Sequence, residues 1–558
     1  MSRAPTPQTR TLAGLLAARA RSDHSEAPAI RFKEGDDFVE WSWAEYWDQA
    51  QAAAAGLWGH GVRPGDRVLM LVPDVMDGVR CIFGAWALGA VPIQVGVPYR
   101  LTNVMAFLDE LRSLAASLEV KAMVVADQLA GFATGNEPVP LIPASTIAAG
   151  APAVALPDPE DAFGPALLQL TSGSTGHSRG VIIPHERLTL HMAAMSEALP
   201  SHDDASAVSW LPLHHDMGLI GGLLFPFYNG FVAHMLSPLD FRARPISWLE
   251  TMSRFRGSIC AAPPSAYALC IRLADSAREA GLDLSSWECA MIGAEQISPK
   301  LLRRFADAFA PCGFRPEAFF PVYGLAEATV AVTFPVLLDK THIDTIHRPT
   351  LEREGRALPC EAGPEALELT GCGAPIPRTE LRIVDLEGRP GESEREVGEI
   401  QFRSESAMTG YFKDPVETEA VLDGDWIRTG DLGYLAEGRI YITGRKKELI
   451  IRAGHNLMPS VIEEIVGDVD GVRRGCVVAV GVRAERLETE KAWVVAETKR
   501  PADTHEALVV AIREALAARG VFVDRVLMVA PGSLPKTTSG KLKRRAVADD
   551  LTARAAAT

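Results

Sequence analysis

One ten-residue segment constrains this chain most, because it combines three glycines with five hydroxyl side chains. It runs Thr171-Ser172-Gly173-Ser174-Thr175-Gly176-His177-Ser178-Arg179-Gly180, between the apolar runs 166–170 and 181–183. Such a loop turns tightly and can direct backbone N–H and side-chain O–H groups at a cluster of anionic oxygens. It has neither the Gly-Lys-Ser/Thr ending of a P-loop nor the Gly-x-Gly-x-x-Gly pattern of a dinucleotide site. The segment therefore indicates a phosphate-binding loop of another kind; the alternative is a flexible surface turn.

Length, charge and cysteine usage narrow the class of protein. The chain has 558 residues, more than one core normally supports, so we expect at least two domains. A net charge of −15 argues against general binding to nucleic acid or membrane surfaces. The eight cysteines form no Cys-x-x-Cys pair, which favours reduced thiols in the cytoplasm over disulfides or a zinc site. The polar N-terminus lacks a signal-peptide core, and no apolar run reaches the roughly 18 residues of a membrane span.

Helical and strand patterns alternate up to about residue 440. Apolar runs at 67–72 and 120–126 predict buried strands. The Ala-rich stretch 43–59 predicts an amphipathic helix, and 79–88 predicts another that ends at Gly89. This alternation predicts an α/β fold with a largely parallel sheet.

The pattern changes near residue 440. Segments 431–435 and 439–443 flank Ala436-Glu437-Gly438 and predict a hairpin. A block with the pattern strand, helix, two strands, helix and strand follows, with Pro459 in a first helical turn and 506–518 as a second helix. We therefore expect a large domain of residues 1–445 and a small α+β domain of residues 446–558.

Six separated segments occur in an order that resembles the adenylate-forming superfamily of acyl-CoA ligases, amino-acid adenylation domains and luciferases. They are the loop 171–180, Trp210-Leu-Pro-Leu-His-His-Asp-Met-Gly-Leu-Ile-Gly-Gly222, Ile292-Gly-Ala-Glu295, Pro321-Val-Tyr-Gly-Leu-Ala-Glu-Ala-Thr329, Trp426-Ile-Arg-Thr-Gly-Asp-Leu-Gly433 with Gly444-Arg445, and Leu534-Pro-Lys-Thr-Thr-Ser-Gly-Lys541. The resemblance covers nearly the whole chain. It implies a large, multi-layer N-terminal domain with a small, mobile C-terminal domain, and it implies that the protein joins a carboxylate to AMP.

The resemblance also implies roles for individual residues. Attack of a carboxylate oxygen on the α-phosphorus of ATP brings two anions together, so positive charge and aligned donors should dominate catalysis. The hydroxyl-rich loop would hold the β- and γ-phosphates, Tyr323 would lie against adenine, and Asp431 would bind the ribose hydroxyls. Glu327 would bind Mg²⁺, which takes hard oxygen ligands. The implied nucleotide-binding residues are Thr171, Ser172, Gly173, Ser174, Thr175, Gly176, Arg179, Gly293, Ala294, Glu295, Tyr323, Gly324, Asp431 and Arg445.

By the same resemblance, the small domain would supply the catalytic Lys541. A point charge on a flexible stem suits a bridge between the acyl oxygen and the α-phosphate. Lys447 is the hinge candidate about which the small domain would rotate. Each residue also has a structural alternative: Lys541 as a solvated loop lysine, Asp431 as a turn cap, Tyr323 as core packing and Glu327 as a first-turn acid.

Further motifs resemble the fatty acyl-AMP ligase branch of the superfamily. They are Tyr-Gly-Leu-Ala-Glu-Ala-Thr at 323–329, His-Asp-Met-Gly-Leu-Ile-Gly at 215–221 and Cys-Ala-Ala-Pro-Pro-Ser-Ala-Tyr at 260–267. Residues 335–370 look like the inserted segment of that branch, or are a tolerated surface insertion. The branch implies transfer to the phosphopantetheine thiol of an acyl carrier protein. The turn 454–459 matches only partly, because it has no aromatic residue before its proline. Arg179 replaces the lysine of many relatives but keeps the charge and adds a bidentate fork.

The acyl substrate is the least constrained feature. Motif position implies an acyl pocket at Met217, Leu219, Ile220 and Leu223, with His215 either at the reacting carboxylate or packed nearby. No acidic residue is placed to pair with an α-amine, which favours an aliphatic acid. The basic residues Lys536, Lys541, Lys543, Arg544 and Arg545 form either a docking surface for an acidic carrier or a solvated face. We expect an ATP- and Mg²⁺-dependent fatty acyl-AMP ligase; the alternatives are an acyl-CoA ligase and a non-catalytic binding module.

Overall fold

The computed structural model describes residues 9–97, 103–132, 139–148, 155–172, 178–200, 202–385, 387–391, 393–452, 455–483, 490–536 and 542–556. Two predicted site elements lie outside these ranges. They are the loop tip Gly173, Ser174, Thr175 and Gly176, and the lysine Lys541.

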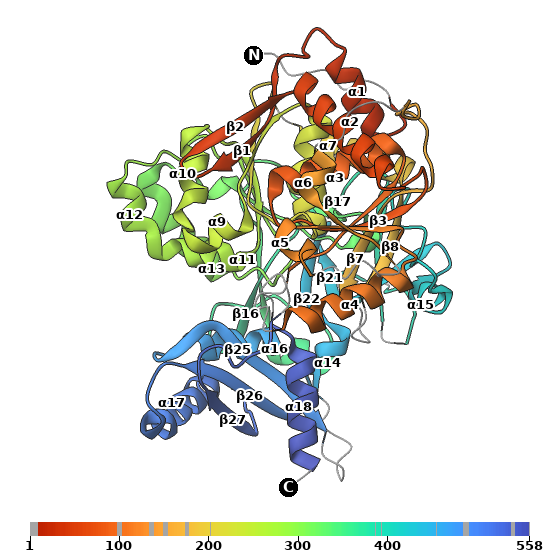
Figure 1. Ribbon diagram of the computed structural model, residues 1–558. Helices are drawn as coiled ribbons and strands as arrows, with labels where there is room; N and C mark the ends of the chain where they lie inside the picture. The colour runs from red at the N-terminus through yellow and green to blue at the C-terminus, as the bar shows by residue number, and fades with distance from the viewer. Residues whose placement is uncertain are drawn as a thin grey trace.

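A seven-stranded sheet forms the first layer of the large N-terminal part (Figure 1). In spatial order its strands are β13 (Phe319–Pro321), β12 (Cys289–Ile292), β11 (Ile259–Ala262), β9 (Ser206–Ser209), β10 (Val232–Met235), β1 (Pro28–Glu34) and β2 (Asp37–Ser42). All neighbours pair in parallel except β1 and β2. Every residue of β11 and β12 is buried, as expected for parallel strands that are covered on both faces.

A second sheet is wholly parallel. Its order is β4 (Val91–Gln94), β3 (Arg67–Leu71), β5 (Ala122–Val125) and β6 (Leu141–Pro143). The predicted strands at 67–72 and 120–126 are thus confirmed, the second in shorter form. The helix α2 (Trp43–Gly59) has both predicted ends, because Ser42 and Glu45 form a capping box at its start. The helix α3 (Val75–Leu88) begins four residues before the prediction, since Asp74 caps it, and it ends at left-handed Gly89.

The other helices of this part cover the sheets. They are α1 (Leu12–Ala20), α4 (Val104–Ser117), α5 (Asp127–Ala130), α6 (Ala144–Ala148), α7 (His185–Ala198), α8 (Phe225–Asn229), α9 (Pro238–Ala243), α10 (Ile246–Arg254), α11 (Pro264–Cys270), α12 (Ala274–Glu279), α13 (Pro299–Phe309) and α15 (Pro415–Val421). Trp248, Tyr267 and Trp287 are fully buried between them. These large rings belong to the main apolar core, whereas α4 packs with β3, β4 and β5 in a second, smaller cluster.

A third sheet departs from the parallel expectation. It is antiparallel, in the order β18 (Thr379–Val384), β19 (Gly398–Ser404), β21 (Trp426–Ala436) and β20 (Leu422–Asp423), with β22 (Arg439–Arg445) also paired to β21. The predicted hairpin 431–443 is confirmed within β21 and β22. A two-stranded sheet of β14 (Thr333–Phe334) and β17 (Ala374–Pro375) lies in the same half of the sequence. The large part therefore combines parallel and antiparallel layers.

Residues 335–370 form a packed unit. It contains the antiparallel strands β15 (Ile343–His347) and β16 (Ala366–Thr370) and the helix α14 (Arg348–Glu354). Ile346, Leu351 and Leu369 are buried against Tyr434, Tyr441 and Met458. The Arg348 guanidinium donates to the backbone carbonyl of Arg519, far along the chain. The segment thus contacts both the β21–β22 hairpin and the C-terminal residues.

The C-terminal residues fold around their own apolar clusters, drawn in blue in Figure 1. The elements are β23 (Ile450–Arg452), β24 (His455–Leu457), α16 (Pro459–Gly467), β25 (Val472–Arg483), β26 (Glu490–Thr498), α17 (His505–Ala517), β27 (Arg525–Val529) and α18 (Arg544–Ala556). The predicted helices at Pro459 and 506–518 are present. The final helix α18 was not predicted, and it buries Val547 and Leu551 against β25. The boundary at 445/446 stays a prediction.

Among the described helices, none combines the length and the apolar character that a membrane span requires.

The buried ion pair within 335–370 gives a test of how firmly that segment is packed. Arg348 and Glu352 lie 3.0 Å apart, with side chains 4% and 7% exposed. Burial raises the pKa of the Glu352 carboxyl, and the Arg348 charge holds it down. Replacing Arg348 by Ala leaves a buried carboxylate without its cation, so we expect a loss of about 3–5 kcal/mol in the free energy of unfolding at pH 8.

This loss should shrink at acidic pH, because the pKa of Glu352 rises further in the variant and a protonated carboxyl is cheaper to bury. Thermal unfolding at pH 5 and pH 8 measures both effects. The exposed Arg353 on the same helix provides the control, and Arg353→Ala should change stability by less than about 0.5 kcal/mol. Equal effects of the two variants would contradict the packed role of Arg348.

Candidate active site

The hydroxyl-rich loop joins two strands of a hairpin. The strand β7 (Pro165–Ser172) pairs with β8 (Ser178–Pro184), and Thr171 lies opposite Arg179. Among the described residues, the Thr171 hydroxyl oxygen is buried without a hydrogen-bond partner. A buried, unsatisfied hydroxyl is costly, so this one is suited to a ligand oxygen. The Gln169 amide donates to the His214 carbonyl at 2.9 Å, which holds the His-His-Asp motif beside the hairpin.

The backbone after β19 brings a tyrosine to the same hairpin. Residues 409–412 pair with β8, so Tyr411 lies across from Val181. The Arg179 guanidinium lies 4.4 Å from the Tyr411 ring centroid and forms a 2.7 Å ion pair with Glu417. The Tyr411 hydroxyl donates to the Glu327 carboxylate at 2.7 Å. Arg179 and Glu327, which lie far apart in the sequence, therefore share one neighbour.

The two segments assigned to adenine approach each other through backbone. A Cβ on Gly293 would lie 3.0 Å from the Val322 carbonyl oxygen, and a Cβ on Gly324 would lie 1.8 Å from that of Val330. A Cβ would clash with backbone at Gly324 and would be tightly packed at Gly293. Ala294 and Thr329 adopt left-handed φ values of 67° and 71°. Backbone strain of this kind is typical of sites that the surrounding structure fixes in place.

Asp431 connects the nucleotide motifs. Its carboxylate is buried, accepts a 2.8 Å hydrogen bond from the Tyr323 hydroxyl and lies 3.0 Å from the Arg445 guanidinium. Arg445 faces Asp431 across the β21–β22 ladder, and the Thr429 hydroxyl accepts the Asp431 N–H. Burial raises the pKa of the Asp431 carboxyl, whereas Arg445 and the Tyr323 hydroxyl lower it. The three predicted residues therefore form one hydrogen-bonded group.

Glu295 has a different set of contacts. Its carboxylate accepts hydrogen bonds from the backbone N–H and the hydroxyl of Ser265, both at 3.1 Å. Ser265 lies in the first turn of α11, inside the motif 260–267. The contact connects two of the recognised motifs. It is also electrostatically favourable, because the negative carboxylate lies at the positive N-terminal end of the helix dipole.

The predicted acyl pocket lies on an unusual helix. Residues Met217–Leu224 form a π-helix, a form that occurs frequently at functional sites. Leu219, Ile220 and Leu223 are buried in the main core, and Met217 is partly buried. The His215 ring lies 4.7 Å from that of His214, whose pKa burial lowers to about 4. His214 is therefore neutral at pH 7, and the pocket assignment itself stays a prediction.

Magnesium has one predicted ligand. The described part of the chain contains no group of three or more His, Cys, Asp or Glu residues able to hold a metal. Glu327 still fits, because Mg²⁺ bound with substrate phosphates takes one or two carboxylates and keeps several waters. The Tyr411 hydroxyl orients this carboxylate beside the hairpin that carries the hydroxyl-rich loop.

Of the predicted lysine segment, the structure describes only the base, because Lys541 lies outside the described residues. Lys536 and Leu542 form a β-bridge, and the Lys543 N–H donates to the Pro535 carbonyl at 3.0 Å. The proposed docking cluster needs a correction at one residue. Arg544 does not face a partner but bonds Glu463 and Glu448 at 2.7 and 2.8 Å. Lys447 is exposed.

Comparisons with known proteins agree with this geometry. Residues 16–412 match the family described as AMP-binding enzyme. The chain belongs to the AMP-binding enzyme family. As a member of this adenylate-forming family, it uses ATP.

Its relatives confirm the resemblance to the fatty acyl-AMP ligases. A structure from a study of fatty acyl-adenylate ligases of E. coli and L. pneumophila superposes with a TM-score of 0.90 at 31% identity, covering 100% of both chains. The medium-chain-fatty-acid–acyl-carrier-protein ligase JamA of Moorena producens (strain JHB) is 32% identical over 97% of this chain and 95% of its own. A 4-hydroxyphenylalkanoate adenylyltransferase of Mycobacterium tuberculosis (strain ATCC 25618 / H37Rv) is 33% identical over 96% and 91%.

Sequence reasoning missed several residues of this AMP-binding enzyme. Tyr411, Glu417 and Ser265 contact predicted site residues, yet only Ser265 lies in a recognised motif. The sequence offered one signal for Tyr411. The preceding Gly410 marks a turn after the strand pattern of residues 398–407, and such breaks often carry site residues.

The Tyr323–Asp431 hydrogen bond predicts a change in pH dependence. In Tyr323→Phe, Asp431 loses a donor that lowers its pKa, so its pKa should rise. Ionised Asp431 accepts from both ribose hydroxyls, so the acidic limb of the pH profile should move to higher pH. We expect kcat/KM for ATP to fall about tenfold at neutral pH.

The measurement is ATP–pyrophosphate exchange with dodecanoic acid from pH 5 to 9. Tyr441→Phe is the matched control, because the Tyr441 ring stacks on Tyr434 away from Asp431. An unshifted acidic limb in Tyr323→Phe would show that Asp431 does not govern nucleotide binding through its charge.

Proposed function

We propose that the protein is a Mg²⁺-dependent fatty acyl-AMP ligase that converts an aliphatic carboxylic acid and ATP to acyl-AMP and pyrophosphate. The acyl group then passes to the phosphopantetheine thiol of an acyl carrier protein. The observation that supports this most is the single group formed by Tyr323, Asp431 and Arg445, next to a hairpin whose buried Thr171 hydroxyl has no partner among the described residues.

Different residues of the chain have different roles in adenylation. Ionised Asp431 accepts hydrogen bonds from the ribose hydroxyls and thereby fixes the α-phosphorus in position. Arg445 holds Asp431 ionised, since a nearby cation favours the charged form. Thr171 and the rest of its loop donate to the phosphates, and Arg179 adds positive charge at the side of the hairpin. Mg²⁺, held by Glu327 and phosphate oxygens, would neutralise charge on the leaving pyrophosphate.

The small domain completes the site. We assign residues 1–445 to the large domain, 446–558 to the small domain and the hinge to Lys447. Lys541 would reach between the acyl oxygen and the α-phosphate, where negative charge develops as the carboxylate attacks. Met217, Leu219, Ile220 and Leu223 would line the acyl chain, and His215 would stand near the carboxylate. Because these side chains are apolar and largely buried, they favour an uncharged aliphatic chain.

The carrier protein is the favoured acceptor. A relative that covers nearly the whole chain, JamA, is named as a ligase to an acyl carrier protein. The segment 335–370, which resembles the insertion of the acyl-AMP ligase branch, is folded and packed against both parts of the chain rather than loose on the surface.

A product assay tests the reaction and its acceptor. Purified protein is mixed with Mg²⁺-ATP and single acids, namely hexanoic, dodecanoic, hexadecanoic and 4-hydroxyphenylpropanoic acid. Each mixture receives CoA, a holo acyl carrier protein or neither, and mass spectrometry identifies the products. We expect acyl-AMP that persists with CoA and is consumed by the carrier. Rapid formation of acyl-CoA would show that CoA, and not the carrier protein, is the acceptor. If no acid gives an adenylate, the result contradicts the enzyme assignment.

The catalytic lysine gives a separate prediction. Lys541→Ala should lower acyl-AMP formation by about a hundredfold or more, because a charge aimed at the transition state is lost. ATP affinity, measured by calorimetry, should change little, since Asp431 and the hairpin loop remain. Lys543→Ala removes an exposed lysine two residues away and should keep full activity. Equal activity of the two variants would remove Lys541 from the mechanism.

A further inference from the structure

The four residues 445–448 contain charged anchors on both sides of Lys447. Before it, the Lys446 ammonium lies 3.0 Å from the Glu399 carboxylate. After it, the Glu448 carboxylate lies 2.8 Å from the Arg544 guanidinium. Lys447 itself is exposed, and no partner for it exists among the described residues. Two ion pairs thus flank one unpaired residue.

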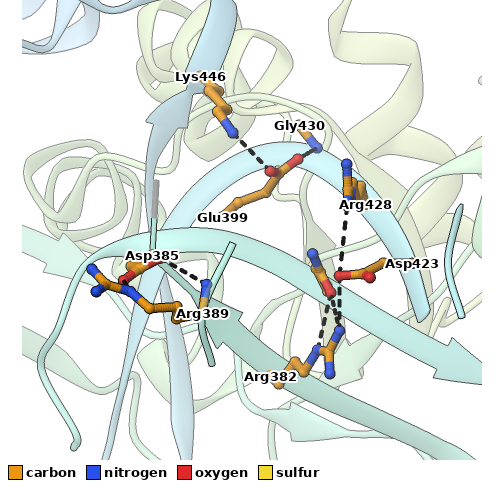
Figure 2. A network of polar contacts seen from close by, with 9 residues as sticks. Arg382, Asp385, Arg389, Glu399, Asp423, Arg428, Gly430 and Lys446 are labelled. Carbon is orange, nitrogen blue, oxygen red and sulfur yellow. Dashed lines mark hydrogen bonds and ion pairs between the residues drawn. The ribbon is translucent and has the colours of Figure 1, made fainter. Parts of the chain in front are cut away.

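The anchor before Lys447 belongs to the large domain. Glu399 is buried on β19, a strand that pairs on both sides within the antiparallel sheet. One carboxylate oxygen binds Lys446, and the other accepts the Gly430 N–H at 3.2 Å, as Figure 2 shows. Gly430 immediately precedes Asp431. Glu399 therefore connects the backbone of the nucleotide-binding aspartate to the residue before the hinge.

The anchor after Lys447 belongs to the small domain. Arg544 bonds Glu463 on α16 through two nitrogens, at 2.8 and 2.7 Å. The Glu463 carboxylate is largely buried and also accepts the Ala479 N–H of β25 at 3.0 Å. Arg544 follows Lys541 by three residues, just after the β-bridge of Lys536 with Leu542. Glu448 therefore connects the residue after the hinge to the base of the lysine segment.

We propose that Glu399 and Glu448 are positioning residues that confine domain rotation to Lys447. Glu399 and Lys446 both precede the hinge residue, and Glu448 and Arg544 both follow it, so neither pair has to break during the rotation. Rotation about a single residue returns the Lys541 segment to the same place relative to Asp431 in every cycle. This inference rests on the proposed function, in which the two domains alternate between adenylation and transfer.

The two ion pairs contribute more to the geometry of the hinge than to the free energy of unfolding. Exposed pairs contribute little to folding, and the Lys446 side chain is 41% exposed. Their geometric effect is larger, because each ties a residue next to the hinge to a strand or helix of its own side of the chain. A misplacement of about 1 Å in a catalytic group can slow a reaction by orders of magnitude.

The test measures the distribution of distances between the domains. Cysteines that carry fluorophores replace Glu279 on α12 and Glu506 on α17, both exposed, and Cys360 is replaced by Ser. The other seven cysteines are buried. Time-resolved energy transfer gives the width of the distribution for the parent and for Glu399→Gln and Glu448→Gln. Rates of dodecanoyl-AMP formation, and of its transfer to a holo acyl carrier protein, are measured separately.

We expect both variants to widen the distribution and to slow both half-reactions by a similar factor of about three to ten. Glu448→Asp, which keeps the charge, should recover part of the loss. Asp470→Asn is the matched control, because it removes an exposed ion pair with Arg500 that lies within the small domain, away from the hinge. It should leave the width unchanged. Unfolding temperatures of all variants detect any general loss of stability.

An unchanged width in Glu448→Gln would overturn the proposal, and so would equal widening in Asp470→Asn. If a variant slows one half-reaction and speeds the other, the ion pair stabilises one of the two domain orientations. That result would also overturn the proposal. If the parent forms acyl-AMP from none of the acids of the product assay, the proposed function is at fault, and the comparison of widths still decides the role of the anchors.

Discussion

The burial of Asp431 determines how its surroundings are built. A buried carboxylate is costly unless cations and donors surround it. The β21–β22 hairpin solves part of this problem locally, because its register places Arg445 opposite Asp431. Tyr323 arrives from a distant segment and adds a hydroxyl donor at 2.8 Å. Two sheets and two recognised motifs therefore meet at one charge, and a ribose with two hydroxyls is the kind of ligand that such a carboxylate can accept.

The glycines near this charge serve the same purpose. Gly324 lets its backbone approach that of Val330 to a distance that no side chain would allow, and Gly293 leaves little room beside Val322, so the segments that would enclose adenine pack closely. Thr329 holds a left-handed backbone while its hydroxyl bonds the Ser406 carbonyl at 2.6 Å. Strain in one turn is balanced by contacts in the next segment, which is how a rigid site is maintained without a ligand.

Local sequence patterns predicted the helices and strands more accurately than they predicted the contacts between distant residues. The ends of α2 and the hairpin 431–443 were predictable because caps and turns carry their own chemistry. The start of α3 was missed although Asp74 is a recognisable cap. The helix α18 was missed because Val547 and Leu551 are its main buried apolar residues. Asp431 and Arg445 were predicted from resemblance, whereas Tyr411, Glu399 and Glu417 act through tertiary contacts that no sequence spacing reveals.

The contacts between the two parts of the chain bear on the rotation that we propose about Lys447. Apolar clusters lie mostly within each part, whereas the bonds across the boundary are polar: Ser298 with Glu464, Lys300 with Asp468, and Arg348 with the Arg519 carbonyl. Water replaces the two exposed contacts, those of Ser298 and Lys300, at little cost, whereas the third comes from the buried guanidinium of Arg348. Leu449, Met458 and Val461, packed with residues of 335–370 and of the β21–β22 hairpin, are apolar contacts across the same boundary. Separating these apolar side chains adds a free-energy cost to rotation. The cost arises at residues 335–370, the segment that resembles the insertion of the acyl-AMP ligase branch.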